Sequence, residues 1–191
     1  MRRRTFVQHS AVSLAGLGGW QHAHAQGPAL NQPLPSATVS AELPGALWCG
    51  SARMRVFGFN VYDATLWVTP EFKASRYAES PFVLELAYLR SLNGRAVAQR
   101  STVEMRRATD YPAAKEANWQ NAMEATFPDV KDGDRLTGLH SPKAGARFWF
   151  NGAARPSIAD VDFSRLFFGI WLSTSTSEPK LRGALLARAT A

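Results

Sequence analysis

ALWCGSARMRVFGFNVYDATLWV, residues 46–68, is the stretch that decides the fold. Aromatic and β-branched residues fill it, and such residues favour strands because their side chains pack well on a pleated surface. Gly50, Gly58 and the Asp63-Ala64 step interrupt the run, and such interruptions are typical of bends or bulges. The composition therefore predicts long strands across this stretch.

Beyond this stretch the hydrophobic period changes. Residues 82–89 predict a further strand, in which Glu85 faces outward or into a polar pocket. Residues 94–108 contain no proline and lack strand-type alternation, and in residues 112–127 the apolar side chains recur at helical spacing. Pro112 suits the first turn of the second helix, because the N–H that it lacks is unpaired there anyway. Two helices are therefore expected after the first strands.

The chain then returns to strands and ends in helices. Residues 135–140 and 146–150 predict strands, and Asn151-Gly152 is typical of a hairpin turn. Asp160 offers an N-cap to a strongly apolar helix, and residues 178–187 predict a short terminal helix. The order strands, helices, strands, helices favours an α+β fold, an antiparallel sheet covered by helices, over a doubly wound parallel sheet.

The first 25 residues are typical of a cleavable signal peptide. Arg2, Arg3 and Arg4 precede a modest apolar stretch at residues 10–19, and a small-x-small triplet follows at residues 23–25. The arginines also fit the twin-arginine pattern of folded export, and the apolar stretch is too short for a membrane anchor. We expect a signal peptide at 1–25, a proline-bearing linker at 26–36, one domain at 37–191, and a periplasmic protein.

Charge and composition argue against several function classes. The formal charge of +7 falls to near +4 without the signal arginines, and no long basic run remains, so no nucleic-acid partner is expected. Cys49 is the single cysteine, which excludes an intrachain disulfide and predicts a buried small residue. His140 is the one histidine after residue 25, and phosphate loops, nucleophile elbows and zinc-protease helices are missing. We therefore expect no metal and no cofactor.

Polar residues embedded in the aromatic strands offer the first functional hypothesis. On a strand of period two, Arg53, Arg55, Phe57 and Phe59 share one face. The two arginines could hold an anionic head group at the mouth of an apolar cleft. The alternative is that both emerge into solvent at the strand end.

Three further groups qualify this hypothesis. Tyr88 and Arg90 close the next strand and could complete such a site, or Arg90 could simply lie on the surface. Ser101, Glu104 and Arg107 share one helix face, where Glu104 could pair with an arginine of the sheet or within its own helix. A third group is an aromatic stripe that is first of all the core side of a helix: Phe163, Phe167 and Trp171.

The ordered set of motifs resembles the chalcone isomerase-like family, in its bacterial exported form. The matching stretches are residues 50–55, 58–64, Leu66-Trp67, 101–107, Trp119, 127–130, Gly133-Asp134, 148–152, and 162–172 on to Leu181-Arg182. The resemblance implies an open-faced β-sandwich: a large antiparallel sheet with helices packed on one side and a ligand cleft between them.

The resemblance also bears on activity. Some relatives are plant isomerases that close a flavanone ring, and others bind fatty acids. In both groups an arginine after a Gly-x-Gly turn contacts the ligand oxygens, which implies Arg53 or Arg55, although Ala52 replaces the second glycine. The plant enzymes also use a tyrosine and an asparagine in the stretch that corresponds to residues 94–107, which contains neither here. Ring closure is therefore not expected.

The resulting hypothesis is a periplasmic, non-catalytic protein that binds a small amphipathic, fatty-acid-like ligand. The rival is an intramolecular lyase, an isomerase of the chalcone type acting on a flavonoid-like phenol, and a third reading is a module that binds a peptide or protein. No stable membrane anchor is expected, and the oligomeric state is not predicted. The expected ligand-binding residues are Arg53, Arg55, Phe57, Phe59, Tyr88, Phe167 and Phe168.

Overall fold

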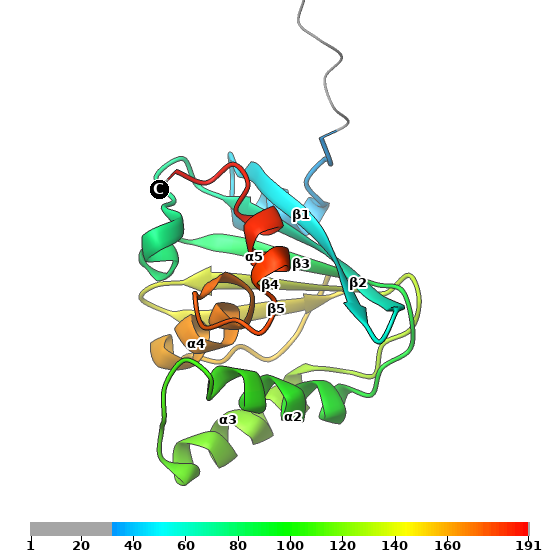
Figure 1. The fold of residues 1–191 in the computed structure, drawn as a ribbon, viewed down its shortest axis with the longest axis vertical. Helices are drawn as coiled ribbons and strands as arrows, with labels where there is room; N and C mark the ends of the chain where they lie inside the picture. The colour runs from blue at the N-terminus through cyan, green and yellow to red at the C-terminus, as the bar shows by residue number, and fades with distance from the viewer. Residues whose placement is uncertain (1–31, 191) are drawn as a thin grey trace, which may run out of the picture. The chain divides into compact units, whose positions relative to one another are not determined.

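A six-stranded antiparallel sheet forms the centre of the protein, whose computed structural model describes residues 32–190 (Figure 1). Neighbouring strands in the sheet are also neighbours in the sequence, so every connection is between adjacent strands. The strands are β1 (Leu47–Val56), β2 (Phe59–Val68), β3 (Phe82–Tyr88), β4 (Arg135–Ser141), β5 (Gly145–Phe150) and β6 (Ala153–Ala154).

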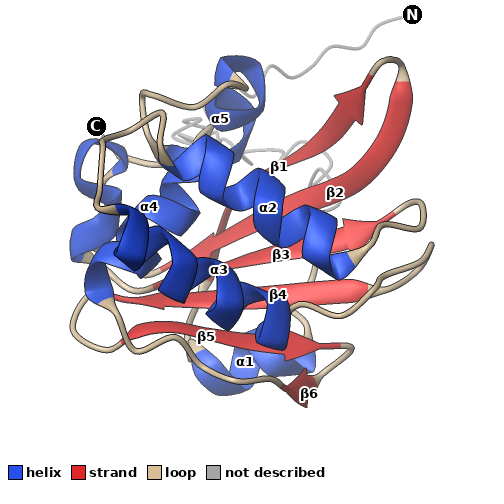
Figure 2. Ribbon diagram, turned by 90° about the horizontal axis from the view of Figure 1, so that it is seen from below, coloured by secondary structure: helices blue, strands red, loops and turns tan. Residues whose placement is uncertain are grey.

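Within residues 32–190, four α-helices cover one face of the sheet, and a fifth lies on the other face (Figure 2). The covering helices are α2 (Gly94–Met105), α3 (Ala113–Thr126), α4 (Val161–Leu172) and α5 (Pro179–Leu185). The short helix α1 (Ala37–Glu42) packs on the opposite face, and a 3-10 helix, η1 (Ala74–Glu79), joins β2 to β3. The predicted α+β class, an antiparallel sheet with helices layered on it, is confirmed.

Helix α4 is the central element of the covering layer. Asp160 caps it, since its Oδ1 accepts hydrogen bonds from the amides of Asp162 and Phe163 at 2.9 and 3.0 Å. The other carboxylate oxygen accepts from Trp119 Nε1 of α3 at 2.9 Å, which ties the two helices together. The predicted stripe is buried as expected: Phe163, Phe167 and Trp171.

The two faces of the sheet have separate apolar cores. The larger core lies between the sheet and helices α2–α5, and it includes Cys49, buried as predicted. The smaller core lies under α1, where Ser36 caps the helix by accepting from the Val39 amide at 3.2 Å. The buried members of the smaller core are Val39, Leu43, Trp67, Val83, Leu139 and Trp149.

Several elements differ from the sequence expectation. Phe57 and Gly58 form a hairpin turn that divides residues 46–68 into β1 and β2. The short elements α1, η1 and β6 were not predicted, because each has too few residues to show a period. The predicted signal peptide and the first part of the predicted linker lie outside the described residues.

His140 is buried in the larger core, where it lies against the rings of Phe82 and Phe168. Its Nδ1 is 2.7 Å from Ser164 Oγ and its Nε2 is 3.0 Å from the carbonyl oxygen of Ala78. A carbonyl can only accept, so Nε2 carries the proton and Nδ1 accepts from the Ser164 hydroxyl. The neutral imidazole satisfies both contacts, which indicates a structural role.

This environment predicts a pH-dependent stability. Burial lowers the pKa of His140 below its ordinary value, although the hydrogen bond to the Ala78 carbonyl opposes the shift. The unfolded chain therefore takes up a proton at pH ~6.5 that the folded chain resists, and the free energy of unfolding falls as the pH drops below that value. Urea unfolding at about pH 7.5 and about pH 5.5 measures this loss across the ordinary pKa of histidine.

The matched variant is His140→Gln, which does not titrate. It is expected to be less stable than the wild type at the higher pH, because an amide fits the site less well, but to lose less stability between the two pH values. Parallel losses in the two proteins would contradict the assignment to His140.

Candidate functional site

Arg53 and Arg55 lie on the face of the sheet opposite helices α2–α5. Arg53 forms a two-point ion pair with Asp63 of β2, with N···O distances of 2.6 and 2.7 Å. Asp63 shares a strand face with Trp67, which belongs to the core under α1. Arg55, two residues beyond Arg53, donates from Nε to Asn60 Oδ1 at 3.0 Å. Neither guanidinium therefore reaches the space between the sheet and the covering helices.

Phe57 and Phe59 lie at the tip of the β1–β2 hairpin. Phe57 is 97% exposed and Phe59 is 64% exposed. The guanidinium carbon of Arg90 lies 5.3 Å from the centre of the Phe59 ring. The structure therefore places the two hairpin phenylalanines apart from Phe167 and Phe168. The four side chains do not line one cleft, contrary to what the sequence had suggested.

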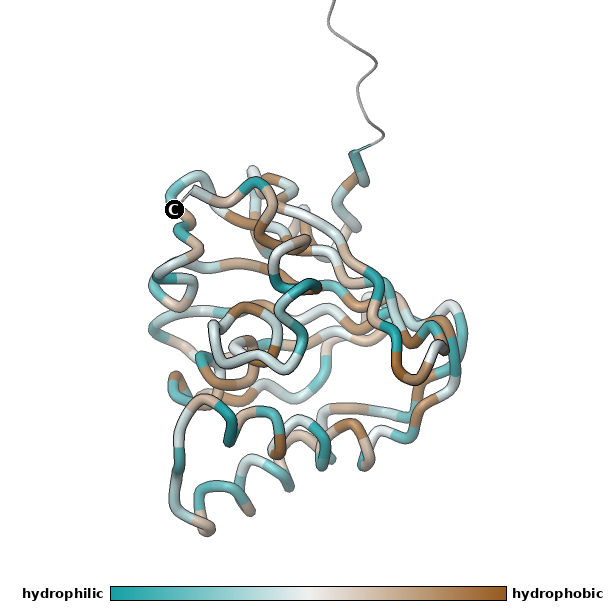
Figure 3. Tube along the Cα trace, viewed as in Figure 1, coloured by the Kyte–Doolittle hydropathy of each residue, from teal (hydrophilic) through white to brown (hydrophobic). Residues whose placement is uncertain are grey.

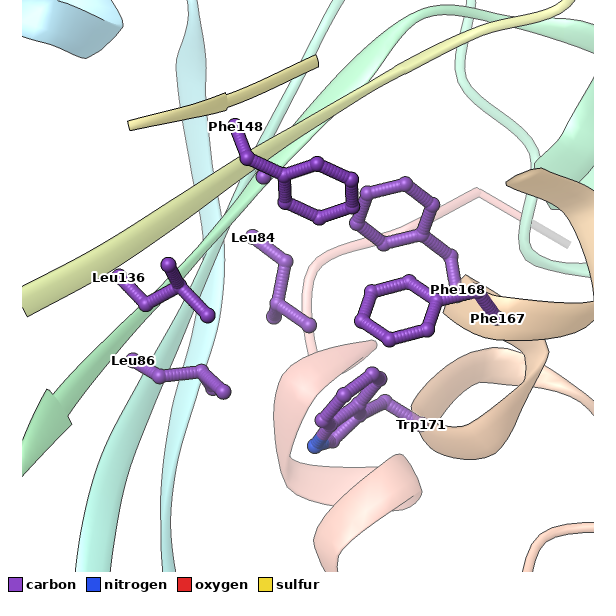
Figure 4. Close-up of a pocket in the computed structure, with 8 residues that line it drawn as sticks. Leu84, Leu86, Leu136, Phe148, Phe167, Phe168 and Trp171 are labelled. Atoms are coloured by element: carbon purple, nitrogen blue, oxygen red, sulfur yellow. The ribbon is translucent and has the colours of Figure 1, made fainter. Parts of the chain in front are cut away.

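Phe167 and Phe168 belong to a closed apolar layer between α4 and the sheet (Figure 4). The space left inside this layer is about 10 Å³, which is close to the minimum for a single water molecule. The layer is therefore packed core, and side chains must move before an alkyl chain can enter it. Its lining residues are Leu84, Leu86, Leu136, Gly138, Phe148, Phe167, Phe168 and Trp171.

Two phenols lie beside this layer, on the side of the sheet that faces the helices. Tyr62 of β2 and Tyr88 of β3 are paired across the strands, and their ring centres are 6.0 Å apart in an edge-to-face arrangement. Trp171 of α4 lines the apolar layer and donates from Nε1 to the Tyr62 hydroxyl at 3.0 Å. The indole therefore stands between the apolar layer and the polar groups around Tyr62.

Both phenols are held in the protonated form. Burial raises the pKa of Tyr62 to about 12; the hydrogen bond from Trp171 opposes this shift, and the charges of Glu178 and Glu104 add to it. Burial and the neighbouring Tyr62 likewise raise the pKa of Tyr88. At neutral pH each hydroxyl is thus a hydrogen-bond donor rather than a phenolate.

Glu104 brings a buried carboxylate from α2 to the same region. It forms ion pairs with Arg100 and with Arg107, whose Nε lies 3.6 Å from Oε2. Oε2 is buried and has no hydrogen-bond partner among the described residues. Of the two arrangements left open by the sequence, the structure shows the pair within the helix segment and not a pair with an arginine of the sheet.

An open hollow of about 550 Å³ lies at Arg107, the ion-pair partner of this carboxylate. It lies between the end of α2 and the loop that follows α4, and its lining residues are Arg107, Thr174, Ser175 and Thr176. Arg107 Nε also donates to the carbonyl oxygen of Ser175 at 3.4 Å, which holds the guanidinium at the hollow. Because Arg107 also forms an ion pair with Glu104, it connects the hollow to the buried carboxylate.

The chemistry of this region is that of a hydrogen-bond donor site. A guanidinium, hydroxyl side chains and protonated phenols all donate to oxygen, and a guanidinium suits a carboxylate in particular. The carboxylate of Glu104 is already ion-paired with two arginines. The arrangement can therefore hold an anionic or carbonyl oxygen at its polar end, with apolar surface behind Trp171.

Within residues 32–190, no three histidine, cysteine or acidic side chains come together in a way that could hold a metal ion. In this same part of the chain, none of the helices combines the length and the apolarity needed to cross a membrane.

The sequence located part of this region. Three of its expected ligand-binding residues lie at the apolar layer or beside it: Tyr88, Phe167 and Phe168. Glu104 and Arg107, which belong to the polar part of the site, were placed on one helix face by their spacing in the sequence. Tyr62 was missed, because strand alternation shows which residues share a face but not which face meets the helices.

Comparison with known families gives a match over most of the chain. The model of a family described as chalcone isomerase-like matches residues 48–187. An uncharacterized protein of Haemophilus influenzae is 28% identical over 155 residues, which cover 79% of this chain and 74% of that protein.

Solved structures give a matching fold. The crystal structure of a fatty-acid binding protein of Arabidopsis thaliana superposes with a TM-score of 0.57 over 75% of this chain and 87% of that chain. Only 10% of the residues are identical, so this likeness concerns the fold alone.

Proposed function

Because this chain belongs to the chalcone isomerase-like family, as its sequence motifs predicted, we propose that it binds a small amphipathic ligand of the fatty-acid type without catalysis. The observation that carries the proposal is the polar donor site beside the apolar layer. The ligand class is supported by the Arabidopsis protein of similar fold, which is named a fatty-acid binding protein.

The polar end of the ligand lies in the hollow at Arg107. Its acidic group accepts from the guanidinium there and, once the Trp171 indole has moved aside, from the buried Tyr62 hydroxyl. A ligand carboxylate replaces part of the contact between Arg107 and Glu104, whose ion pair is long at 3.6 Å. The Arg107 donor is thus in place before the ligand arrives, which lowers the cost of binding.

The apolar body of the ligand lies behind Trp171. This indole both lines the packed layer and donates to Tyr62, so its rotation would join the polar hollow to the apolar space. Met105 of α2 is buried in the same core, and an unbranched thioether side chain adapts readily to a new neighbour. Trp171 is therefore the residue that moves when the ligand enters.

The site of action belongs to the proposal as well: the protein works in the periplasm after export. The support is the order of a basic start, a modest apolar stretch and a small-x-small triplet in the first 25 residues. Fractionation of cells that express the whole chain, followed by N-terminal sequencing of the recovered protein, tests both the compartment and the cleavage point.

The function is tested by identifying the ligand. Residues 26–191, which include every described helix and strand, are purified and extracted with organic solvent, and the extract is identified by mass spectrometry. We expect a co-purified fatty acid or similar amphipathic acid, and displacement of a fluorescent fatty acid by unlabelled acid but not by an alcohol of the same length. No bound lipid, together with turnover of naringenin chalcone above the spontaneous rate, would favour the lyase instead.

Substitution of Arg107 tests the polar end of the site. Arg107→Gln removes a charge-assisted hydrogen bond and is expected to weaken binding of a fluorescent fatty acid by about 1.5–3 kcal/mol, roughly 10- to 150-fold in Kd. Tyr62→Phe removes one neutral hydrogen bond and is expected to cost about 0.5–1.5 kcal/mol. Both affinities are measured by fluorescence titration.

Arg95→Gln is the matched control, since Arg95 lies at the start of the same helix and forms an exposed ion pair with Glu124. It is expected to leave the affinity unchanged. A loss of affinity in Arg53→Gln, with Arg107→Gln unaffected, would instead assign the ligand to the opposite face of the sheet.

A further inference from the structure

The turn of the β1–β2 hairpin places a phenylalanine in a backbone conformation that disfavours it. Phe57 and Gly58 have φ angles of +49° and +82°. The only other non-glycine residue with positive φ in residues 32–190 is Asn151, at +49°, and it is followed by Gly152 at +83°. Asn-Gly is the preferred pair for such a turn, because asparagine tolerates the left-handed region and phenylalanine does not. One molecule thus contains the favoured version and an unfavourable version of the same turn.

The side chains at this tip are also exposed to an unusual degree. Phe57 and Phe59 are 97% and 64% exposed, and Val56 beside them is 40% exposed. Figure 3 shows this hairpin tip in brown, next to hydrophilic residues in teal. A single exposed apolar residue needs no explanation, but a group of adjacent ones marks an interaction surface.

Two positive charges flank the apolar tip without acidic partners among the described residues. Arg55 donates to the neutral amide oxygen of Asn60, and the Arg90 guanidinium lies over the Phe59 ring. Arg53, further along β1, is neutralised by Asp63. The tip therefore combines aromatic side chains at its end with unpaired guanidinium groups just behind them.

This combination is complementary to one kind of surface. Aromatic side chains partition into the interface of a lipid bilayer, and basic residues behind them meet the phosphates of anionic lipids. We propose that the tip of the β1–β2 hairpin docks on an anionic phospholipid bilayer, with Phe57 and Phe59 in the headgroup region and Arg55 and Arg90 against the phosphates. This inference goes beyond ligand binding and does not depend on it.

Co-sedimentation with vesicles tests the proposal. Residues 26–191 are mixed with vesicles of phosphatidylcholine alone, or of equal parts phosphatidylcholine and phosphatidylglycerol. We expect binding to the anionic vesicles that weakens at high salt. The double variant Arg55→Gln/Arg90→Gln is expected to lose roughly fivefold in affinity per charge on these vesicles.

Phe57→Asn separates membrane binding from folding. It creates the Asn-Gly turn that the protein already uses at Asn151, so the Tm is expected to rise by about 2–4 °C. Affinity for anionic vesicles is expected to fall roughly tenfold, because one phenylalanine no longer enters the interface. A variant that folds better and yet binds less cannot owe its loss to misfolding.

Val161→Thr is the control, since it removes an exposed apolar group, 47% exposed, at the start of α4. It is expected to bind vesicles as the wild type does. Equal vesicle binding by the wild type and Phe57→Asn would overturn the proposal, as would binding that ignores the anionic lipid. A dimer of the wild type that Phe57→Asn dissociates, with no vesicle binding, would also overturn it and would make the tip a contact between two copies.

Discussion

Phe168→Ala is expected to lower the free energy of unfolding by about 3–5 kcal/mol, the usual cost of deleting a fully buried aromatic ring. Phe168 is 1% exposed and its ring centre lies 5.2 Å from those of Phe82 and Phe167. The surrounding layer has almost no spare room, so its other side chains cannot fill the space that the ring leaves. Urea unfolding of the variant and the wild type measures the difference.

Gly138 of β4 lies directly against the Phe168 ring. A Cβ atom at this position of β4 would lie 3.0 Å from Phe168 Cζ and 3.2 Å from Phe148 Cε1, so the glycine makes the room that the ring occupies. Gly138→Ala alone is expected to cost about 1–3 kcal/mol by overpacking. In the Phe168→Ala background the added methyl group enters the cavity, so the double variant is expected to lose less than the sum of the two single losses.

Phe59→Ala serves as the matched control, because it deletes the same ring at an exposed position. It is expected to change the free energy of unfolding by no more than about 0.5 kcal/mol. Strict additivity of Phe168→Ala and Gly138→Ala would contradict the contact between the two residues.

The helical part of this core could be predicted from the sequence. Phe163, Phe167 and Trp171 recur at helical spacing after a capping aspartate, and this pattern decides both the helix and its buried face. The succession of strands and helices along the chain followed from composition and hydrophobic spacing. Helix α1 could not be predicted, because two apolar residues, Val39 and Leu43, carry its packing.

The side of the sheet on which Arg53 and Arg55 lie could not be predicted, because it depends on which face the helices cover. Alternation assigned Arg53 and Arg55 to one face, but the helices cover the other face of the sheet. The turn at Phe57 was hidden as well, since phenylalanine is not a usual turn residue and the stretch suggested a strand that continues. Sequence patterns are local, whereas the choice of face is decided by which side packs better against the helices.

The polar site, too, could be predicted only as far as local sequence patterns reach. Glu104 and Arg107 were placed on one helix face by their spacing, which is a local property. The charge of Glu104 acts on Tyr62, whose hydroxyl accepts from Trp171, 109 residues further along the chain. Only the packing of α2 against α4 on the sheet brings these groups together.

Gly50→Ala is the second substitution expected to have a large effect, and it tests how α5 seats on the sheet. A Cβ atom at Gly50 would lie 2.6 Å from the carbonyl oxygen of Leu185 and closer still to that of Ala184. Both are backbone atoms of α5, so no side chain can turn aside and the helix must move away from β1. The expected loss is about 2–4 kcal/mol, at the upper end of overpacking costs.

Gly183→Ala is the natural counterpart, because Gly183 lies within α5 and a Cβ atom there meets nothing within 4 Å. It is expected to stabilise the protein by up to about 1 kcal/mol through helix propensity. Urea unfolding of both variants is the measurement. A Gly50→Ala variant as stable as the wild type would contradict the close packing of α5 on β1, including the burial of Leu181 and Leu185. It would also remove the support for the position of the loop before α5, which shapes the hollow at Arg107.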